Sequence, residues 1–311
     1  MPPRSLTTPP RRVTYGVVTA ARNEAPNLER LARALVHQTI APSAWVIVDN
    51  GSTDGTLELA RGLSEEHAWI TVPEMRCAGV PTRGRTVARA VHLGLSHVPL
   101  RTDVVVKVDA DVSMEPHFFE RMLAFFDADS RLGMASGSRY EREGGVWRQR
   151  FLTGTSVEAQ CRAYRWECLL DILPFEEHKG WDGIDEVKAN LRGWTTSVFR
   201  GLAFRHHRRI GGRELSRFSA WKAEGTGAHY MGYRPSYLLL RALFHARREP
   251  AAIGLVAGYL DAAIQRTPQC PDRAVTRYVR DQQRVGQLLA RIAEVTGAAV
   301  PVSASPAPGR R

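Results

Sequence analysis

The first half of the chain alternates short apolar runs with segments of helical period. From Val13 to about Ser138, each apolar run leads into a polar turn and then into apolar residues spaced three and four apart. This alternation predicts a parallel sheet whose strands are joined by crossover helices. The predicted strands are 13–20, 44–49, 69–72 and 103–108, and the predicted helices are 27–37, a stretch from about 56, 85–96 and 116–126.

The second half has a less regular pattern. A basic loop at 208–217 precedes a helical region from about 236 to 295, and no flexible linker separates this region from the rest. We therefore expect it to pack on the α/β unit as an extension. The strand-like segments of this half are 132–138, 195–199 and 202–206, and the helical ones are 162–172 and 182–192.

These patterns predict an α/β domain with a helical extension and two tails. The ends of the chain are rich in Pro, Arg, Ser and Ala, a composition that does not support a packed core. The expected parts are a disordered basic tail (1–12), an α/β domain (13–234, with halves 13–138 and 139–234), a helical extension (235–299) and a disordered tail (300–311).

The composition is that of a globular and strongly basic protein. Hydrophobic residues make up 43% and charged residues 24% of the 311 residues, which excludes wholesale disorder, a collagen and a coiled coil. Lys and Arg outnumber Asp and Glu by 43 to 32, so the formal charge is +11. A surface this basic favours nucleic acid, anionic lipid or a phosphorylated substrate as a partner.

No export signal or membrane span is predicted. Residues 1–12 lack an apolar core, and the longest apolar stretch, 251–260, is about half the length of a spanning helix. The four Cys residues form no CxxC pair and have no His at metal spacing, which favours a reducing compartment. We expect a cytoplasmic protein that either is free or rests on the inner face of the membrane.

Asp109-Ala110-Asp111 is the most informative motif, because it ends a buried Val-rich strand. Side chains alternate along a strand, so the two carboxylates project to the same side and offer hard oxygens to Mg²⁺ or Mn²⁺. The simpler interpretation is a polar turn that caps the next helix. Ligands of open parallel sheets bind beyond the carboxyl ends of the strands, where this motif lies.

A second polar turn follows the strand at 44–49. Asp49 ends that strand and faces the same crevice, where it would accept hydrogen bonds from a base or a ribose. The following Asn50-Gly51-Ser52-Thr53-Asp54-Gly55 has the ordinary features of a helix start, with a capping side chain and glycines that tolerate positive φ.

The motifs above belong to three longer segments, VVTAARNEAPNLERLARALVHQT (17–39), WVIVDNGSTDGT (45–56) and DVVVKVDADVSMEPHFFERML (103–123). Together these segments resemble the nucleotide-sugar-binding half of family 2 glycosyltransferases. A second stretch comprises 164–170, 180–186 and 192–194. It resembles the acceptor-side block of that family, in which a Glu-Asp pair begins a helix and a Gly-aromatic pair follows.

The resemblance implies a GT-A fold, which is a Rossmann-like and mostly parallel sheet flanked by helices, with the helical extension after it. It implies inverting transfer of a sugar from a nucleotide diphosphate to a glycan or lipid-linked acceptor hydroxyl, with a divalent metal, Mg²⁺ or Mn²⁺, as cofactor. Asp111 would ligate the metal directly, and Asp109 would contact either the ribose or the metal. The nucleotide-sugar site would comprise Ala20, Glu24, Asp49, Arg83, Arg85, Asp109, Ala110 and Asp111.

The resemblance also implies a carboxylate base, for which two candidates remain. Asp182 aligns with the family's aspartate, and Asp185 lies one helical turn later. Trp181 replaces the usual Glu before Asp182, so a degenerate protein that only binds its ligand remains an alternative. Asp182 could also have a purely structural role, in which it caps the first turn of a surface helix.

A late histidine, His206 or His207, would provide a third metal ligand or a diphosphate contact, and His207 is our first choice. The arginines around this pair would meet a diphosphate or lie on a solvated basic face, and they are Arg200, Arg205, Arg208, Arg209 and Arg213. The apolar stripe at 233–264 fits a membrane surface, core packing or a dimer contact, and the last two together are favoured over the first.

Two rival classes fit less well. A sugar nucleotidyltransferase would carry a Gly-rich basic loop after the first strand, where this chain has Ala21-Arg22-Asn23-Glu24. No nucleic-acid-binding motif is present, and the basic residues lie in separate patches, so we expect no nucleic acid partner.

Overall fold

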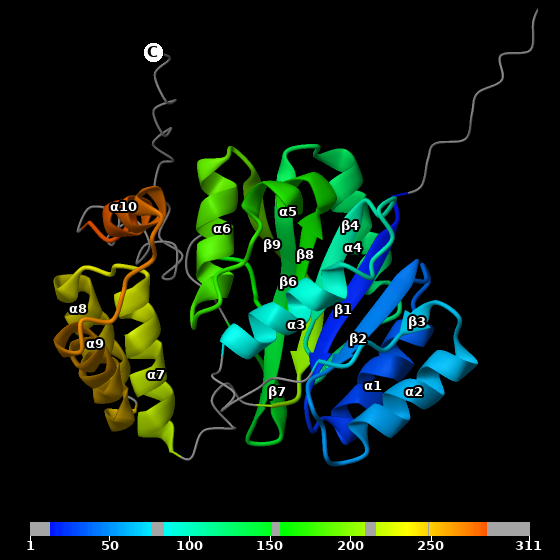
Figure 1. Ribbon diagram of the computed structural model, residues 1–311, viewed down its shortest axis with the longest axis horizontal. Helices are drawn as coiled ribbons and strands as arrows, with labels where there is room; N and C mark the ends of the chain where they lie inside the picture. The colour runs from blue at the N-terminus through cyan, green and yellow to red at the C-terminus, as the bar shows by residue number, and fades with distance from the viewer. Residues whose placement is uncertain (1–12, 76–83, 151–155, 209–215, 248, 285–311) are drawn as a thin grey trace, which may run out of the picture. The chain divides into compact units, whose positions relative to one another are not determined.

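The computed structural model describes residues 13–75, 84–150, 156–208, 216–247 and 249–284 (Figure 1). The expected tails at 1–12 and 300–311 lie outside these residues. The described strands form one mixed sheet in the order β3-β2-β1-β4-β8-β6-β9-β5, with β7 paired to β6. They are β1 (Tyr15–Ala21), β2 (Ala44–Asp49), β3 (Ile70–Thr71), β4 (Val104–Val108), β5 (Val112–Met114), β6 (Leu132–Glu143), β7 (Val146–Arg150), β8 (Cys161–Arg165) and β9 (Thr195–His206).

The four strands of the first half are parallel, as their sequence pattern predicted. β1 pairs with β2 on one side and with β4 on the other, and β2 pairs with β3. All residues of β2 and β4 are buried, because helices cover both faces of a parallel sheet. The predicted α/β fold class is thus confirmed.

The second half makes the sheet mixed. β8 runs antiparallel to both β4 and β6, whereas its residues were expected to begin a helix at 162. Cys161 and Ala163 alternate here with Arg162 and Tyr164, and a buried central strand places both sets inside the protein. The two strand pieces expected at 195–199 and 202–206 are one strand, β9, with a register shift opposite Gly137 and Ser138.

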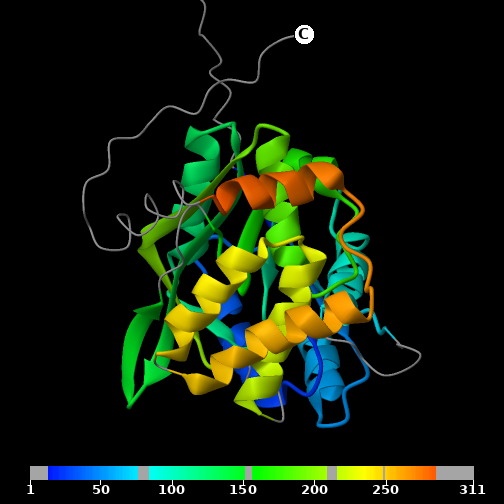
Figure 2. The ribbon, with the colours of Figure 1, turned by 90° about the vertical axis from the view of Figure 1, so that its left-hand side faces the viewer.

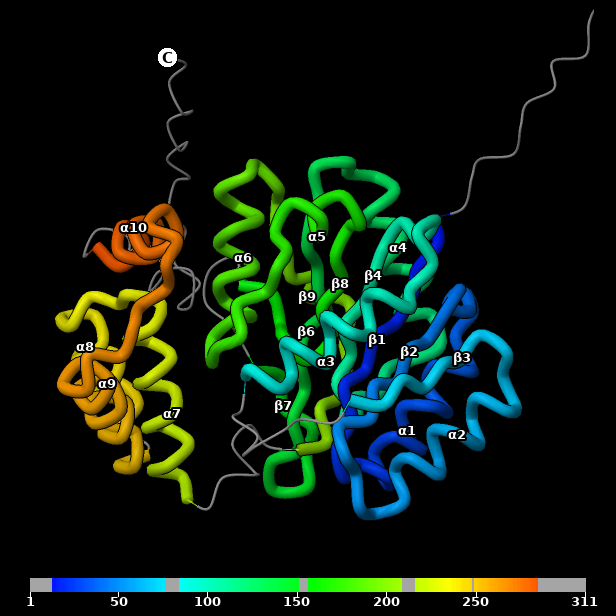
Figure 3. Tube along the Cα trace, in the orientation of Figure 1, coloured from blue at the N-terminus to red at the C-terminus, as the bar shows by residue number. Residues whose placement is uncertain are grey.

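Helices cover the two faces of the sheet with separate hydrophobic cores. One core includes Leu31 and Phe119 against Val106, and the other includes Val91 and Leu169 against Val105. Figure 3 traces how the chain passes from face to face between strands. The helices of the first core are α1 (Ala25–Val36), α2 (Thr56–Glu66) and α4 (Phe118–Ala128), and those of the second are α3 (Arg85–Leu95), α5 (Trp166–Ile172) and α6 (Trp181–Leu191).

The helices after residue 213 form a second unit, drawn in yellow to orange in Figure 2. Its own small core consists of Ala228, Leu238, Ala242, Leu255 and Tyr259. This unit therefore includes a helix that the expected boundary at 234–235 would leave in the preceding domain. Among the described helices, none combines the length and the hydropathy needed to cross a bilayer. The unit contains α7 (Arg217–Tyr230), α8 (Pro235–Ala246), the 3₁₀ helix η1 (Pro250–Ile253), α9 (Gly254–Ile264) and α10 (Arg273–Gln282).

Candidate functional site

The polar turns that follow β1, β2 and β4 gather at one edge of the sheet. These strands are parallel and adjacent, so their carboxyl ends meet there, and Ala21 pairs in register with Asp49. The expected binding residues Ala20 and Ala110 provide backbone at this edge, Ala20 near the end of β1 and Ala110 buried within the DAD turn. Crevices beyond the carboxyl ends of parallel strands are the usual ligand sites of such sheets.

The turns after β1 and β2 are tied together by hydrogen bonds. Asn23 has a φ of 54°, and its side-chain oxygen accepts from the backbone N–H of Thr53 at 2.8 Å. The backbone N–H of Glu24 donates to the hydroxyl of Thr56 at 2.8 Å. This cross-linking fixes the entrance of α1 beside that of α2 and holds the Glu24 carboxylate in the crevice.

Asp49 combines a fixed carboxylate with an acceptor that has no partner. Its Oδ2 accepts from the backbone N–H groups of Gly51 at 3.0 Å and Ser52 at 3.1 Å. Its Oδ1, like the Oδ1 of Asn50, is buried and accepts no hydrogen bond within the described chain. An unpaired buried acceptor costs about 1–3 kcal/mol, so this pair of oxygens favours a ligand that brings N–H or O–H donors.

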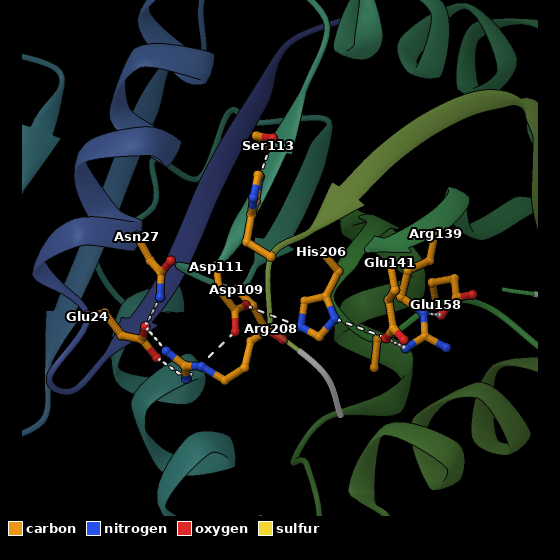
Figure 4. A network of polar contacts seen from close by, with 12 residues as sticks. Glu24, Asn27, Asp109, Asp111, Ser113, Arg139, Glu141, Glu158, His206 and Arg208 are labelled. Atoms are coloured by element: carbon orange, nitrogen blue, oxygen red, sulfur yellow. Dashed lines mark hydrogen bonds and ion pairs between the residues drawn. The ribbon is translucent and has the colours of Figure 1, made fainter. Parts of the chain in front are cut away.

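The two aspartates of the DAD turn have different surroundings. Asp109 Oδ1 lies 2.5 Å from Nζ of Lys107, which is itself buried and also donates to the carbonyl of Ala159. Burial raises the pKa of Asp109, while Lys107 opposes that rise. Asp111 instead faces His206, with 3.5 Å from Oδ1 to Nε2, and Arg208, with 3.7 Å from Oδ2 to Nη1 (Figure 4).

Arg208 connects the two acidic turns. Its guanidinium donates to both carboxylate oxygens of Glu24, at 2.8 and 2.5 Å, while Asn27 donates to the same carboxylate at 2.7 Å. This bidentate geometry fixes the plane of the guanidinium. A positive group therefore lies between Glu24 and Asp111, in the crevice where a diphosphate would need one (Figure 4).

His206 lies between the DAD turn and a buried ionic cluster. Its Nδ1 is 3.2 Å from Glu141 Oε1, and Arg139 joins Glu141, at 2.8 Å, to Glu158, at 3.1 Å (Figure 4). Although burial lowers it, the pKa of His206 rises to about 9 through its bonds to Asp111 and Glu141. The register that pairs His206 with Val112 and Glu141 thus aims the imidazole at Asp111.

His207, our first choice for the metal, has its side chain elsewhere. Its Nε2 lies 2.7 Å from the hydroxyl of Ser113, and its ring meets the edge of Trp147 at 5.3 Å. Burial, together with the charge of Arg30, lowers its pKa to about 4. Of the two histidines that the sequence left open, the structure brings His206 to the carboxylate of Asp111.

The donor set suits a small divalent cation. Oδ1 of Asp111 and Nε2 of His206 are 3.5 Å apart, so both atoms reach one ion at bond lengths of roughly 2.0–2.2 Å once the cation has displaced the Nε2 proton. Asp109 is engaged by Lys107, so the three expected ligands do not form one cluster. Over the residues that the structure describes, no group of three or more His, Cys, Asp or Glu side chains has the arrangement of a metal site.

The two candidate bases on α6 lie in contrasting environments. Asp185 is 2% exposed and accepts from Arg162 at 2.7 Å and from the Tyr164 hydroxyl at 2.6 Å. Burial raises its pKa against the effect of Arg162. Asp182 is partly exposed in the first turn, and its carboxylate makes no hydrogen bond or ion pair with the described residues.

Arg85, which was expected to contact the nucleotide sugar, makes a different interaction. Its Nε donates to the carbonyl of Glu177 at 3.4 Å, and Arg89 pairs with the Glu177 carboxylate at 2.7 Å. At Gly84, a Cβ would lie 2.7 Å from the backbone of Lys179, so α3 begins directly against the segment that leads into α6. Arg83 lies outside the described residues.

Sequence reasoning missed Lys107, Glu141 and Arg162 as parts of the site. Lys107 was detectable, because a lysine inside an otherwise apolar strand needs an anionic partner, which here is Asp109. Arg162 was also detectable as a charged residue inside a buried strand, if the alternation of small and large polar residues in CRAYR (161–165) is taken to predict a strand. Glu141 carries no comparable signal, because its role depends on the register between β6 and β9.

Three solved structures share this fold. A mannosyltransferase from Pyrobaculum calidifontis, solved with GDP-Man and Mn²⁺, is 17% identical over 93% of this chain and 88% of its own, with a TM-score of 0.56. S. aureus TarS 1–349 with UDP-GlcNAc is 15% identical over 92% of each chain, with a TM-score of 0.55. GalNAc-T7 with UDP, GalNAc and Mn²⁺ is 12% identical over 92% of this chain and 58% of its own, with a TM-score of 0.59.

These likenesses confirm the GT-A fold, since structural agreement at such low identity concerns the fold alone. The family is established by the sequence. The family model for "Glycosyl transferase family 2" matches residues 16–181, which is more than half of the 311 residues and includes the three polar turns and the start of α6. The chain belongs to glycosyl transferase family 2.

Proposed function

We propose that this glycosyltransferase moves a sugar from a nucleotide-diphosphate donor to an acceptor hydroxyl with inversion, in polysaccharide or lipid-linked glycan synthesis. The observation that carries the proposal is the pair of buried, unpartnered oxygens on Asp49 and Asn50, at the same edge of the sheet as the DAD turn. A nucleotide base or ribose supplies the N–H or O–H donors that these acceptors lack. The DAD turn, which follows β4 on the other side of β1, would hold the diphosphate and its cation.

The similar structures support the donor class. They were solved with GDP-Man, with UDP-GlcNAc, and with UDP and GalNAc, all of which are nucleotide sugars or their parts. Two of the three also contain Mn²⁺. These ligands belong to those proteins, and the shared fold makes the same class of donor the first to test here.

Asp111 and His206 would hold the divalent cation, with Asp109 close behind them. A bound Mg²⁺ or Mn²⁺ would supply positive charge to the departing nucleotide diphosphate. Arg208 adds a guanidinium in the same crevice, and its fork geometry suits phosphate oxygens. Glu24 holds that guanidinium in place from the side of α1.

We assign the general base to Asp182. An acceptor hydroxyl is a weak nucleophile, and a carboxylate that takes its proton contributes about 10²–10⁴-fold. The Asp182 carboxylate is partly exposed and lies at the positive end of the α6 dipole, which favours its ionised form. Asp185 is enclosed by Arg162 and Tyr164, so its role is to position the first turn of α6.

The test is release of nucleoside diphosphate from a panel of UDP-, GDP- and dTDP-sugars with oligosaccharide and lipid-linked acceptors. We expect turnover with at least one pair, its abolition by EDTA and its restoration by Mn²⁺. The Asp111→Asn variant should lose it, while Asp103→Asn, at the opposite end of β4, should keep it.

The alternative is a degenerate GT-A protein that binds a donor without transferring its sugar, which Trp181 in place of the usual Glu keeps open. Donor binding by calorimetry without turnover on any acceptor would favour that alternative. If the protein neither binds nor turns over any nucleotide sugar, both the transferase proposal and the binding-only alternative are contradicted.

A further inference from the structure

The helix α8 has its apolar residues on the side that faces solvent. Leu239, Leu240, Leu243 and Phe244 are 52%, 50%, 57% and 65% exposed. Leu239 and Leu243 are four residues apart, as are Leu240 and Phe244, so these side chains lie on one face of the helix. An ordinary surface helix turns such a face inward and its polar face outward, so this outer face of α8 is suited to an apolar environment.

The neighbouring elements extend the same feature. Ile253 at the end of η1 is 64% exposed, and Leu260 and Ile264 of α9 are 53% and 79% exposed. The α8 helix packs against both η1 and α9 within the helical unit (Figure 2). Single exposed apolar residues are common on protein surfaces. Seven exposed apolar residues on three consecutive elements that contact one another indicate an interaction surface.

The same unit is strongly basic. From residue 214 to the end, the sequence contains 14 Lys and Arg and seven Asp and Glu, so this third of the chain carries most of the formal charge of +11. Arg241 and Arg247 belong to α8 and its C-cap, next to the apolar face. Positive charge beside exposed Leu and Phe is the pattern of a helix that lies in an anionic membrane interface.

We propose that the outer face of α8, continued by Ile253, Leu260 and Ile264, docks on the surface of an anionic lipid bilayer. At 12 residues, α8 is about 18 Å long, which is too short to span a bilayer and suits a helix lying in its plane. The inference goes beyond the proposed function, because it rests on the helical unit and on none of the residues of the crevice.

Charge selects lipid over a protein partner. A protein interface of this kind favours aromatic and apolar contacts with few charges at its centre. The flanking arginines instead match phosphate headgroups, and each basic residue near an anionic surface contributes about 1 kcal/mol, or about fivefold in partitioning. A second copy of this chain would bring the same positive charge and would be repelled.

The test is co-flotation of the full-length protein with vesicles of phosphatidylcholine alone and with 30% phosphatidylglycerol. We expect binding to the anionic vesicles that weakens at least tenfold between 50 mM and 500 mM salt. The triple substitution Leu239→Gln, Leu243→Gln and Phe244→Gln should reduce partitioning at least tenfold. Arg241→Gln with Arg247→Gln should reduce it about 25-fold at low salt, because two contributions of about 1 kcal/mol are lost.

The control is Leu100→Gln, which removes an 84% exposed leucine from the first unit and should leave vesicle binding unchanged. Circular dichroism and nucleotide-sugar binding should be native in every variant, since all the altered side chains are exposed or outside the crevice. Vesicle binding that the triple substitution leaves intact would overturn the proposal. Absence of vesicle binding, with dimers in sedimentation that the triple substitution dissociates, would assign the face to self-association instead.

Discussion

Asp182 and Asp185 lie one turn apart on α6, and their surroundings give them different roles. Arg162 donates to the carboxylate of Asp185 and also to the backbone carbonyl of Asp182. The buried ion pair therefore fixes the first turn of the helix, and the carboxylate of Asp182 stays available to a substrate. Spacing alone left the two residues as alternatives, because it does not show which one is enclosed.

This difference predicts that substitution of Asp182 lowers activity, whereas substitution of Asp185 lowers stability. Asp182→Asn should lower kcat about 10²–10⁴-fold with little change in donor Kd or stability, because only the proton acceptor is lost. Asp185→Asn should lower the free energy of unfolding by about 3–5 kcal/mol, because it removes the nearest carboxylate of the buried Arg162 and leaves it only Glu186 at 3.8 Å. Steady-state kinetics, donor titration and urea unfolding measure the two effects.

The matched control is the substitution Asp171→Asn, since Asp171 is an exposed carboxylate that accepts from the Trp194 indole. It should cost little in either measurement. Normal turnover in Asp182→Asn would remove the base assignment, and a normal urea midpoint in Asp185→Asn would remove its structural role.

Glu186 predicts a pH dependence of stability. Burial raises its pKa to about 7, although Arg162 and the backbone N–H of Val157 oppose the rise. Its folded pKa lies above its unfolded pKa near 4.5, so its contribution to stability is complete below about pH 4.5 and is lost as the pH rises through 7. The loss is on the order of 3 kcal/mol.

Glu186→Gln should remove this dependence, because the amide oxygen still accepts from Val157 and cannot ionise. Urea unfolding between pH 4.5 and 8 should show that the variant gains stability relative to the native protein as the pH increases. A constant difference across this range would show that Glu186 is ionised in the folded protein at all of these pH values.

The sequence indicated the crevice residues better than their partners. Asp49, Asp109 and Asp111 follow apolar strands, so periodicity and polarity together locate them. The choice between His206 and His207 needed the strand register, because adjacent residues at a strand end point in opposite directions. The partners Glu141 and Lys107 depend in the same way on which strands lie next to each other.

At the scale of elements, the parallel strands were predictable and the antiparallel ones were less so. β2 is a continuous apolar run that ends in Asp49, and its bounds agree with the prediction. β8 was assigned to a helix because the apolar period of α5 begins directly after it at Trp166. Local sequence does not mark the boundary, since a strand buried on both faces keeps Arg162 and Tyr164 inside by hydrogen bonds that form only in the fold.

Close helix packing in the second unit is a further property of elements. At Gly258 in α9, an added Cβ would lie 1.9 Å from the carbonyl oxygen of Lys222 in α7. Gly225 in α7 meets the backbone of Leu255 in the same way. The two helices therefore touch through their backbones, which only glycine permits.

Gly258→Ala should consequently destabilise the protein by at least about 1–3 kcal/mol, because the helices must move apart. Gly62→Ala in α2 is the matched control, because nothing lies within 4 Å of its added Cβ. That substitution should stabilise by up to about 1 kcal/mol through helix propensity. Thermal unfolding of both variants checks the pair, and equal shifts of Tm would contradict the backbone contact.

At the scale of the whole molecule, the chain combines a family 2 transferase domain with a basic helical unit. Composition predicted a basic protein, and the fold shows that its arginines lie in two different kinds of surroundings. Arg208 lies in the crevice between carboxylates, whereas Arg241 and Arg247 flank an exposed apolar face. The net charge of the sequence did not distinguish these two groups of arginines, because side chains acquire distinct surroundings only in the folded chain.

We expect Asp111 and His206 to hold a cation at the same edge of the sheet as the acceptors on Asp49 and Asn50. Anomalous diffraction from crystals grown with Mn²⁺ and UDP or GDP tests it most directly. We predict a manganese peak in contact with the Asp111 carboxylate and His206 Nε2, and a nucleotide that donates to Asp49 Oδ1. Manganese bound elsewhere, or a nucleotide that leaves Asp49 and Asn50 without a partner, would contradict the account.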